Sequence, residues 1–138
     1  RARYAGRLSG PLLDRIDLHV EVPRLDSRAV MEGQPAEPSR SIRERVARAR
    51  QIQAARYAGR PYRCNAEAPA RVIRRYASPD AAGRELLRAA MDRLGLSARA
   101  YDRILRVART IADLEGCEAV RASDVAEAIQ YRSLDRGP

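Results

Sequence analysis

The chain contains no lysine, no phenylalanine and no tryptophan among its 138 residues. Its core must therefore be built mainly from aliphatic side chains, with six tyrosines as the only aromatic residues. Without lysine, a phosphate-binding loop of the Gly-Lys-Ser/Thr type is excluded. Cys64 and Cys117 lie far from each other and from His19, the single histidine. A structural zinc site needs about four ligands, so we expect no metal site here.

Other missing features limit the location of the protein. No run approaches the roughly 20 apolar residues that cross a bilayer, and no signal peptide is visible. Two isolated cysteines are typical of reduced thiols. All 27 basic residues are arginine and alanine is abundant, which is typical of a GC-rich bacterial genome. We therefore expect a bacterial cytoplasmic protein with no membrane partner.

The charge is strongly positive, at +9 for this short chain. Such an excess suits an anionic partner, either nucleic acid or the phosphates of a nucleotide. The genomic bias toward arginine weakens any argument that each arginine was selected for its position.

Residues 8–22, with the sequence LSGPLLDRIDLHVEV, are the most informative stretch. Gly10-Pro11 indicates a turn, and a charged pair, Asp14-Arg15, directly precedes an alternating pattern typical of a strand. The apolar face of that strand would hold Ile16, Leu18, Val20 and Val22, and the other face Asp17, His19 and Glu21. No later segment predicts a partner strand, so we expect this strand to belong to a larger sheet.

This stretch resembles the region before the last core strand of magnesium-chelatase-like AAA+ ATPases, and most closely the ComM/YifB group. The resemblance implies that Arg15 is an arginine finger, which reaches the ATP site of a neighbouring subunit. It implies that Asp14 is the acidic neighbour of the finger. The alternative is that Asp14 and Arg15 form a solvated pair at the start of a strand.

The rest of the chain predicts a linker and then a helical bundle. Residues 24–40 lack apolar periodicity and contain Pro35 and Pro38. Helices are expected at about 39–57, 66–76, 78–95 and 97–115, and from about 121 onward. Ser39 or Ser41 is expected to cap the first of these, Pro79 to lie in the first turn of the third, and Ser97 to cap the fourth.

The predicted fold class is therefore all-α, a small helical bundle preceded by one orphan β-strand and a linker. AAA+ proteins carry such a bundle after their last core strand, as a lid over the nucleotide. The resemblance thus implies that residues 1–38 are the end of an AAA+ core and that residues 39–138 are the C-terminal lid.

The helix expected at 97–115 has two distinct faces. Its apolar face would contain Tyr101, Ile104, Leu105, Ala108, Ile111 and Ala112. Arg99, Arg103 and Arg106 fall on the opposite face. Residues 96–112 closely resemble the lid helix of the ComM/YifB group, in which Arg99 takes the place of the sensor-2 arginine that contacts the γ-phosphate of ATP. Arg103 and Arg106 are possible contacts to phosphate or to a partner, and the alternative for the whole row is a solvated surface.

The chain by itself has neither a Walker A nor a Walker B motif, so we expect no ATPase activity and no bound cofactor from it alone. The resemblance implies a full-length protein that uses ATP and Mg²⁺ and forms a ring, expected to be a hexamer. For ComM-type proteins it further implies action on DNA, as branch migration during natural transformation.

Two other functions fit part of the sequence. A stand-alone, arginine-rich helical module that binds nucleic acid through phosphate would explain the charge but not the orphan strand. A plain protein-interaction bundle is a third possibility. A P-loop in the upstream coding sequence would decide in favour of the ATPase.

Overall fold

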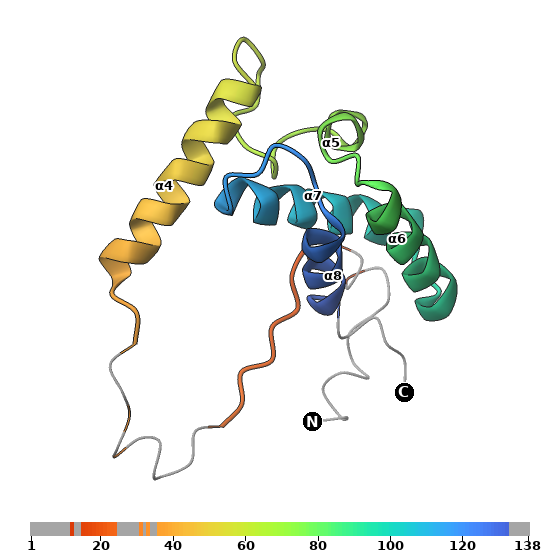
Figure 1. Cartoon of the computed structure of the whole chain (residues 1–138), viewed down its shortest axis with the longest axis horizontal. Helices are drawn as coiled ribbons and strands as arrows, with labels where there is room; N and C mark the ends of the chain where they lie inside the picture. The colour runs from red at the N-terminus through yellow and green to blue at the C-terminus, as the bar shows by residue number, and fades with distance from the viewer. Residues whose placement is uncertain (1–11, 13–14, 25–30, 32, 34–35, 133–138) are drawn as a thin grey trace.

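A computed structural model describes Leu12, residues 15–24, Met31, Gly33 and residues 36–132. Within these residues the chain forms five α-helices joined mostly by short loops (Figure 1). They are α4 (Ser39–Arg56), α5 (Ala70–Tyr76), α6 (Ala81–Leu94), α7 (Ala98–Leu114) and α8 (Ala122–Gln130). Helix α7 lies at the centre and packs against α4, α5 and α8, while α6 packs against α8. The predicted all-α bundle is confirmed.

The ends of α6 and α7 follow their local sequence. Asp80 is the N-cap of α6, and its carboxylate accepts a 2.6 Å hydrogen bond from the amide of Gly83. Gly95 ends the helix in the left-handed conformation that glycine adopts without strain. Ser97 caps α7 as predicted, with its hydroxyl accepting from the amide of Ala100.

Two details of the predicted helix starts are wrong. Pro38, not Ser39 or Ser41, occupies the N-cap of α4, and no side chain caps that helix. A proline has no N–H to leave unsatisfied and favours the extended backbone that precedes a helix. Pro79 lies before the cap of α6 rather than in its first turn, because the Asp80 side chain takes the capping position.

The core is aliphatic and centred on α7. Ile104, Leu105, Ala108 and Ala112 are each at most 1% exposed. Ile73 from α5 and Val125 from α8 are fully buried in the same cluster. The predicted orientation of α7 is confirmed, since this apolar face is buried and Arg99 lies exposed outside it. Among the described residues no helix is long and apolar enough to cross a membrane.

A group of polar side chains is buried beside this core, between α4 and α7. Asp113 accepts hydrogen bonds from the side chains of Arg56 and Arg109, and from the side-chain amide of Asn65 at 3.0 Å. Arg109 is only 1% exposed and also donates to the backbone carbonyls of Cys117 and Glu118. Burial lowers the pKa of Arg109, an effect that Asp113 partly offsets. This group joins α4, α7 and the loop between α4 and α5.

The predicted strand at residues 16–22 does not form in the described part of the chain. His19, on the polar face, is only 6% exposed, and its amide donates to the carbonyl of Tyr131 at 2.7 Å. On the apolar face, Leu18, Val20 and Val22 are 47%, 66% and 81% exposed. A strand needs a partner for its backbone groups, and none of the described segments supplies one. Leu18 still lies at a hollow beside Val107 and Ile111 of α7, whereas Val20 and Val22 remain mostly uncovered by the described bundle.

Candidate functional site

A hollow of about 310 Å³ lies where the segment after Leu12 meets α7 and the start of α5. Its lining consists of Arg15, Ala70, Arg99, Asp102, Arg103 and Arg106. The hollow therefore brings together Arg15 with all three arginines of the predicted row. Asp14 lies outside the described residues.

Local structure presents Arg15 and Arg99 to this hollow. The amide of Arg15 donates to the carbonyl of Leu12 at 3.0 Å, which closes a turn and leaves the Arg15 side chain exposed. Arg99 is in the first turn of α7, two residues after the Ser97 cap. Neither guanidinium has an ion-pair or hydrogen-bond partner among the described residues.

The other charged side chains at the hollow are already engaged. Asp102 is held by Arg74 through two hydrogen bonds, of 2.7 and 3.1 Å, so its negative charge is compensated. Arg103 donates to the carboxylate of Asp17 at 2.8 Å. Arg106 donates to the carbonyls of Asn65 and Ala68, both at 3.0 Å. Arg106 thus fixes the loop before α5, and its positive charge adds to the field of the hollow, since no carboxylate of the described residues pairs with it.

This arrangement is suited to an anion with several oxygen atoms. Guanidinium groups donate in a planar fork that matches the oxygens of a phosphate, and no described residue occupies the donors of Arg15 or Arg99. Among the described residues there is no cluster of three or more His, Cys, Asp or Glu side chains that could hold a metal ion. The arginines favour a phosphate ligand at this hollow.

Sequence reasoning missed two ion pairs at this hollow. The sequence pattern places Asp17 only on the polar face of a strand, yet Asp17 pairs with Arg103. No pattern singles out Arg74, yet it neutralises Asp102. Neither contact has a signal in the sequence, because each joins segments that are distant along the chain. The Arg109–Asp113 pair does have a signal in the sequence, because the two residues are four apart in a helix.

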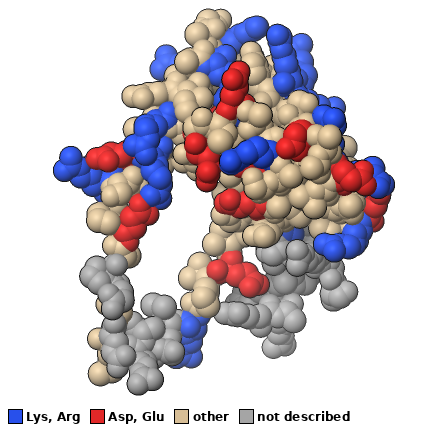
Figure 2. Space-filling model, viewed as in Figure 1, with Lys and Arg blue, Asp and Glu red and all other residues tan. Residues whose placement is uncertain are grey.

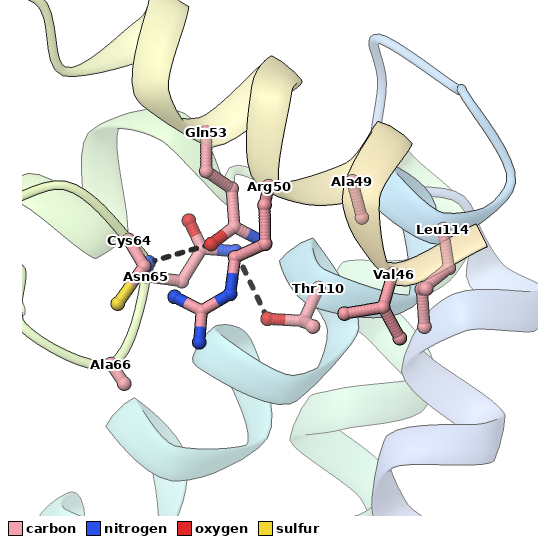
Figure 3. Close-up of a pocket in the computed structure, with 9 residues that line it drawn as sticks. All are labelled: Val46, Ala49, Arg50, Gln53, Cys64, Asn65, Ala66, Thr110 and Leu114. Atoms are coloured by element: carbon pink, nitrogen blue, oxygen red, sulfur yellow. Dashed lines mark hydrogen bonds between the residues drawn. The ribbon is translucent and has the colours of Figure 1, made fainter. Parts of the chain in front are cut away.

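A second hollow, of about 230 Å³, lies between α4, α7 and the loop at Cys64–Ala66 (Figure 3). Its polar groups mostly bind each other. The backbone N–H of Asn65 donates to the side-chain oxygen of Gln53. The side-chain amide of Asn65 donates to the hydroxyl of Thr110 at 2.9 Å. These bonds connect α4 to α7, so we regard this hollow as part of the buried polar group and not as the functional site.

The face of the molecule that Figure 2 shows carries charges of both signs. In the view of Figure 2, acidic side chains are interspersed among the arginines over much of the bundle. Several arginines pair with carboxylates on the surface, as Arg40 does with Glu44 and Arg88 with Glu85 and Asp92. This distribution does not favour a stand-alone nucleic-acid-binding module.

Comparison with known proteins decides the family. Residues 36–132 match the family model described as "Magnesium chelatase, subunit ChlI C-terminal", and residues 1–30 match "Magnesium chelatase, subunit ChlI". The chain belongs to the magnesium-chelatase-like family of the ComM/YifB type. The resemblance inferred from residues 8–22 and 96–112 is thereby confirmed.

Several relatives align over almost the whole chain. Competence protein ComM of Haemophilus influenzae is 43% identical over 135 residues, and an uncharacterized protein of Mycobacterium tuberculosis is 42% identical over 132. The uncharacterized protein YifB of Escherichia coli is 37% identical over 138 residues. The alignments cover 96–97% of this chain but 26% of each relative. The chain therefore spans about a quarter of the length of these magnesium-chelatase-like proteins.

Proposed function

We propose that this chain supplies the arginine finger, Arg15, and the sensor-2 arginine, Arg99, to the ATP sites of a ring-shaped ATPase. Asp14 would be the acidic neighbour of the finger. In this proposal the chain does not hydrolyse ATP by itself. It completes a site whose phosphate-binding loop and Mg²⁺ ligands belong to another part of the full-length protein.

The observation that carries the proposal is the meeting of Arg15 and Arg99 at one hollow, each with a guanidinium that no described residue engages. During phosphoryl transfer, charge develops on the oxygens of the transferred group, and positioned guanidiniums stabilise it. Two arginines that share a hollow can meet oxygens of the same phosphate group.

This placement refines the roles that the family resemblance implies. A finger acts on the ATP of a neighbouring subunit. If Arg15 does so, Arg99 of the same chain faces that neighbour's ATP as well, because both arginines line the same hollow. We therefore propose that the two arginines act as one unit across a subunit interface.

The remaining proposals concern the whole protein. We propose a homo-oligomeric ring, expected to be a hexamer, that uses ATP and Mg²⁺ to act on DNA. One relative is named a competence protein. This name supports a role in competence. Together with the family resemblance, it leads us to propose branch migration during natural transformation, in the bacterial cytoplasm, as the process served.

The proposal is tested by Arg15→Ala in the full-length ring. Loss of the finger should reduce ATP turnover by about 10³- to 10⁵-fold, equivalent to about 4–7 kcal/mol of barrier. ATP binding should be nearly unchanged, since the finger acts on the transition state. Mixing these subunits with subunits disabled in their own P-loop should restore part of the activity. Wild-type turnover by the Arg15→Ala ring would refute the assignment.

A further inference from the structure

The segment that carries Arg15 is fastened to the bundle by hydrogen bonds to α7 and to the residues that directly follow α8, whose positions Figure 1 shows. The carbonyl of Ile16 accepts a hydrogen bond from Arg132, just beyond α8, and the amide of His19 donates to Tyr131. Between these contacts in the chain, Asp17 accepts the hydrogen bond from Arg103 of α7. Of the three, the Asp17–Arg103 contact alone comes from the helix that carries Arg99.

The position of this ion pair relates it directly to both functional arginines. Asp17 follows Arg15 by two residues, and Arg103 follows Arg99 by one helical turn on the same face of α7. Two residues of extended chain span at most roughly 7 Å. The Asp17–Arg103 pair therefore joins the Arg15 segment to α7 beside the hollow. A shift of either element there changes the separation of the Arg15 and Arg99 guanidiniums.

We propose that Asp17 and Arg103 are a positioning pair, which fixes Arg15 relative to Arg99 so that both meet the same phosphate group. This inference rests on the proposed function. The side chains of Arg103 and Asp17 are 30% and 35% exposed, so the pair contributes little to folding stability. Its role is geometric, and a misplacement of about 1 Å at a reacting centre can reduce a rate by about 100-fold.

A direct role of Arg103 at the phosphate predicts a different result. Asp17 would then compete with the phosphate for Arg103, and its removal would leave turnover unchanged or raise it. In the positioning role, Asp17 and Arg103 are equally necessary, and loss of either has the same effect.

The test uses the full-length ring and the variants Asp17→Asn and Arg103→Gln. Each should lower kcat by roughly 10- to 100-fold, with the dissociation constant for ATP changed by less than about twofold, since the pair does not hold the ground-state nucleotide. The exchange variant, which combines Asp17→Arg with Arg103→Asp, should recover a large part of the lost kcat. Arg88→Gln, which breaks surface ion pairs on α6, is the matched control and should leave kcat unchanged.

The outcomes separate this inference from the function on which it rests. If Arg15→Ala abolishes turnover but Asp17→Asn retains wild-type kcat, the positioning pair is refuted and the finger stands. If Arg103→Gln alone is impaired, Arg103 contacts phosphate directly and the pair is again refuted. If Arg15→Ala retains wild-type turnover, the proposed function fails and the positioning role fails with it.

Discussion

Arg109 and Asp113, one turn apart in α7, form an ion pair of 3.0 Å that is almost completely removed from solvent. The pair connects three parts of the fold, because Asp113 also binds Arg56 from α4 and Asn65 from the following loop. A bundle built without phenylalanine or tryptophan thus uses a buried polar group to hold α4 against α7.

Asp113→Ala is expected to destabilise the bundle strongly. It leaves the Arg109 guanidinium buried without its carboxylate, and breaking one partner of a buried pair costs about 3–5 kcal/mol. Urea denaturation monitored by circular dichroism measures the loss. Asp92→Ala is the control, because Asp92 is also ion-paired in a helix but is exposed, and its replacement should cost less than about 1 kcal/mol. Equal losses for the two variants would contradict the structural role of the buried pair.

The pair at the start of α8 should make stability depend on pH. Burial raises the pKa of Asp124, but hydrogen bonds from Arg121 outweigh this effect and the pKa is lowered. Stability from this group is therefore complete above the unfolded pKa, near about 4, and is lost as the pH falls through the lower folded pKa. Unfolding free energies measured between about pH 6 and pH 2 should fall less for Asp124→Asn than for the wild type.

Glu85→Gln provides the comparison for this titration. The pKa of Glu85 is also lowered by an arginine, Arg88, but that pair lies on the open surface. Its replacement should leave the pH dependence almost unchanged. If Glu85→Gln flattened the profile as much as Asp124→Asn, the acid sensitivity would not originate at α8.

The order of the helices and the exposed position of Arg99 were predictable from sequence, because both depend on local periodicity. The capping role of Ser97 is likewise local. The engagement of Arg106 with the loop before α5 was not predicted, because it depends on how that loop packs. The contact between Arg103 and Asp17 was not predictable, since it joins residues 86 positions apart. The inward position of His19 was also missed. Alternation predicts which side chains share a face but not which face the available partners cover.

By itself the chain should bind ATP weakly, with a dissociation constant of about 10⁻³ M or higher. A charged hydrogen-bond contact contributes about 1.5–3 kcal/mol. A millimolar dissociation constant requires about 4 kcal/mol of net binding free energy, which remains only after the entropy cost of association has been subtracted. The contacts of Arg15 and Arg99 cannot reach micromolar affinity without a phosphate-binding loop. Isothermal titration calorimetry of the 138-residue chain measures the dissociation constant. Micromolar binding would contradict the proposal that the phosphate-binding loop belongs to another part of the full-length protein.

Arg99→Ala in the full-length ring should lower turnover, and its effect should not add to that of Arg15→Ala. Two groups that stabilise the same charge act as a unit, so the double variant should lose less than the product of the single losses. Steady-state kinetics of the wild type, the two single variants and the double variant give the coupling free energy between Arg15 and Arg99. Arg99→Lys, which keeps the charge but loses the planar fork, should lie between wild type and Arg99→Ala. Fully independent losses would place the two arginines at different phosphate groups.

The central claim is that Arg15 and Arg99 of one chain act on the same neighbouring ATP. The most direct measurement is the ATPase activity of rings assembled from a mixture of Arg15→Ala and Arg99→Ala subunits. If both arginines reach across the same interface, every interface in the mixed ring lacks one of them, and activity should remain at the level of the single variants. If Arg99 instead served the ATP of its own subunit, interfaces with both arginines intact would form in the mixture, and recovery of activity would contradict the claim.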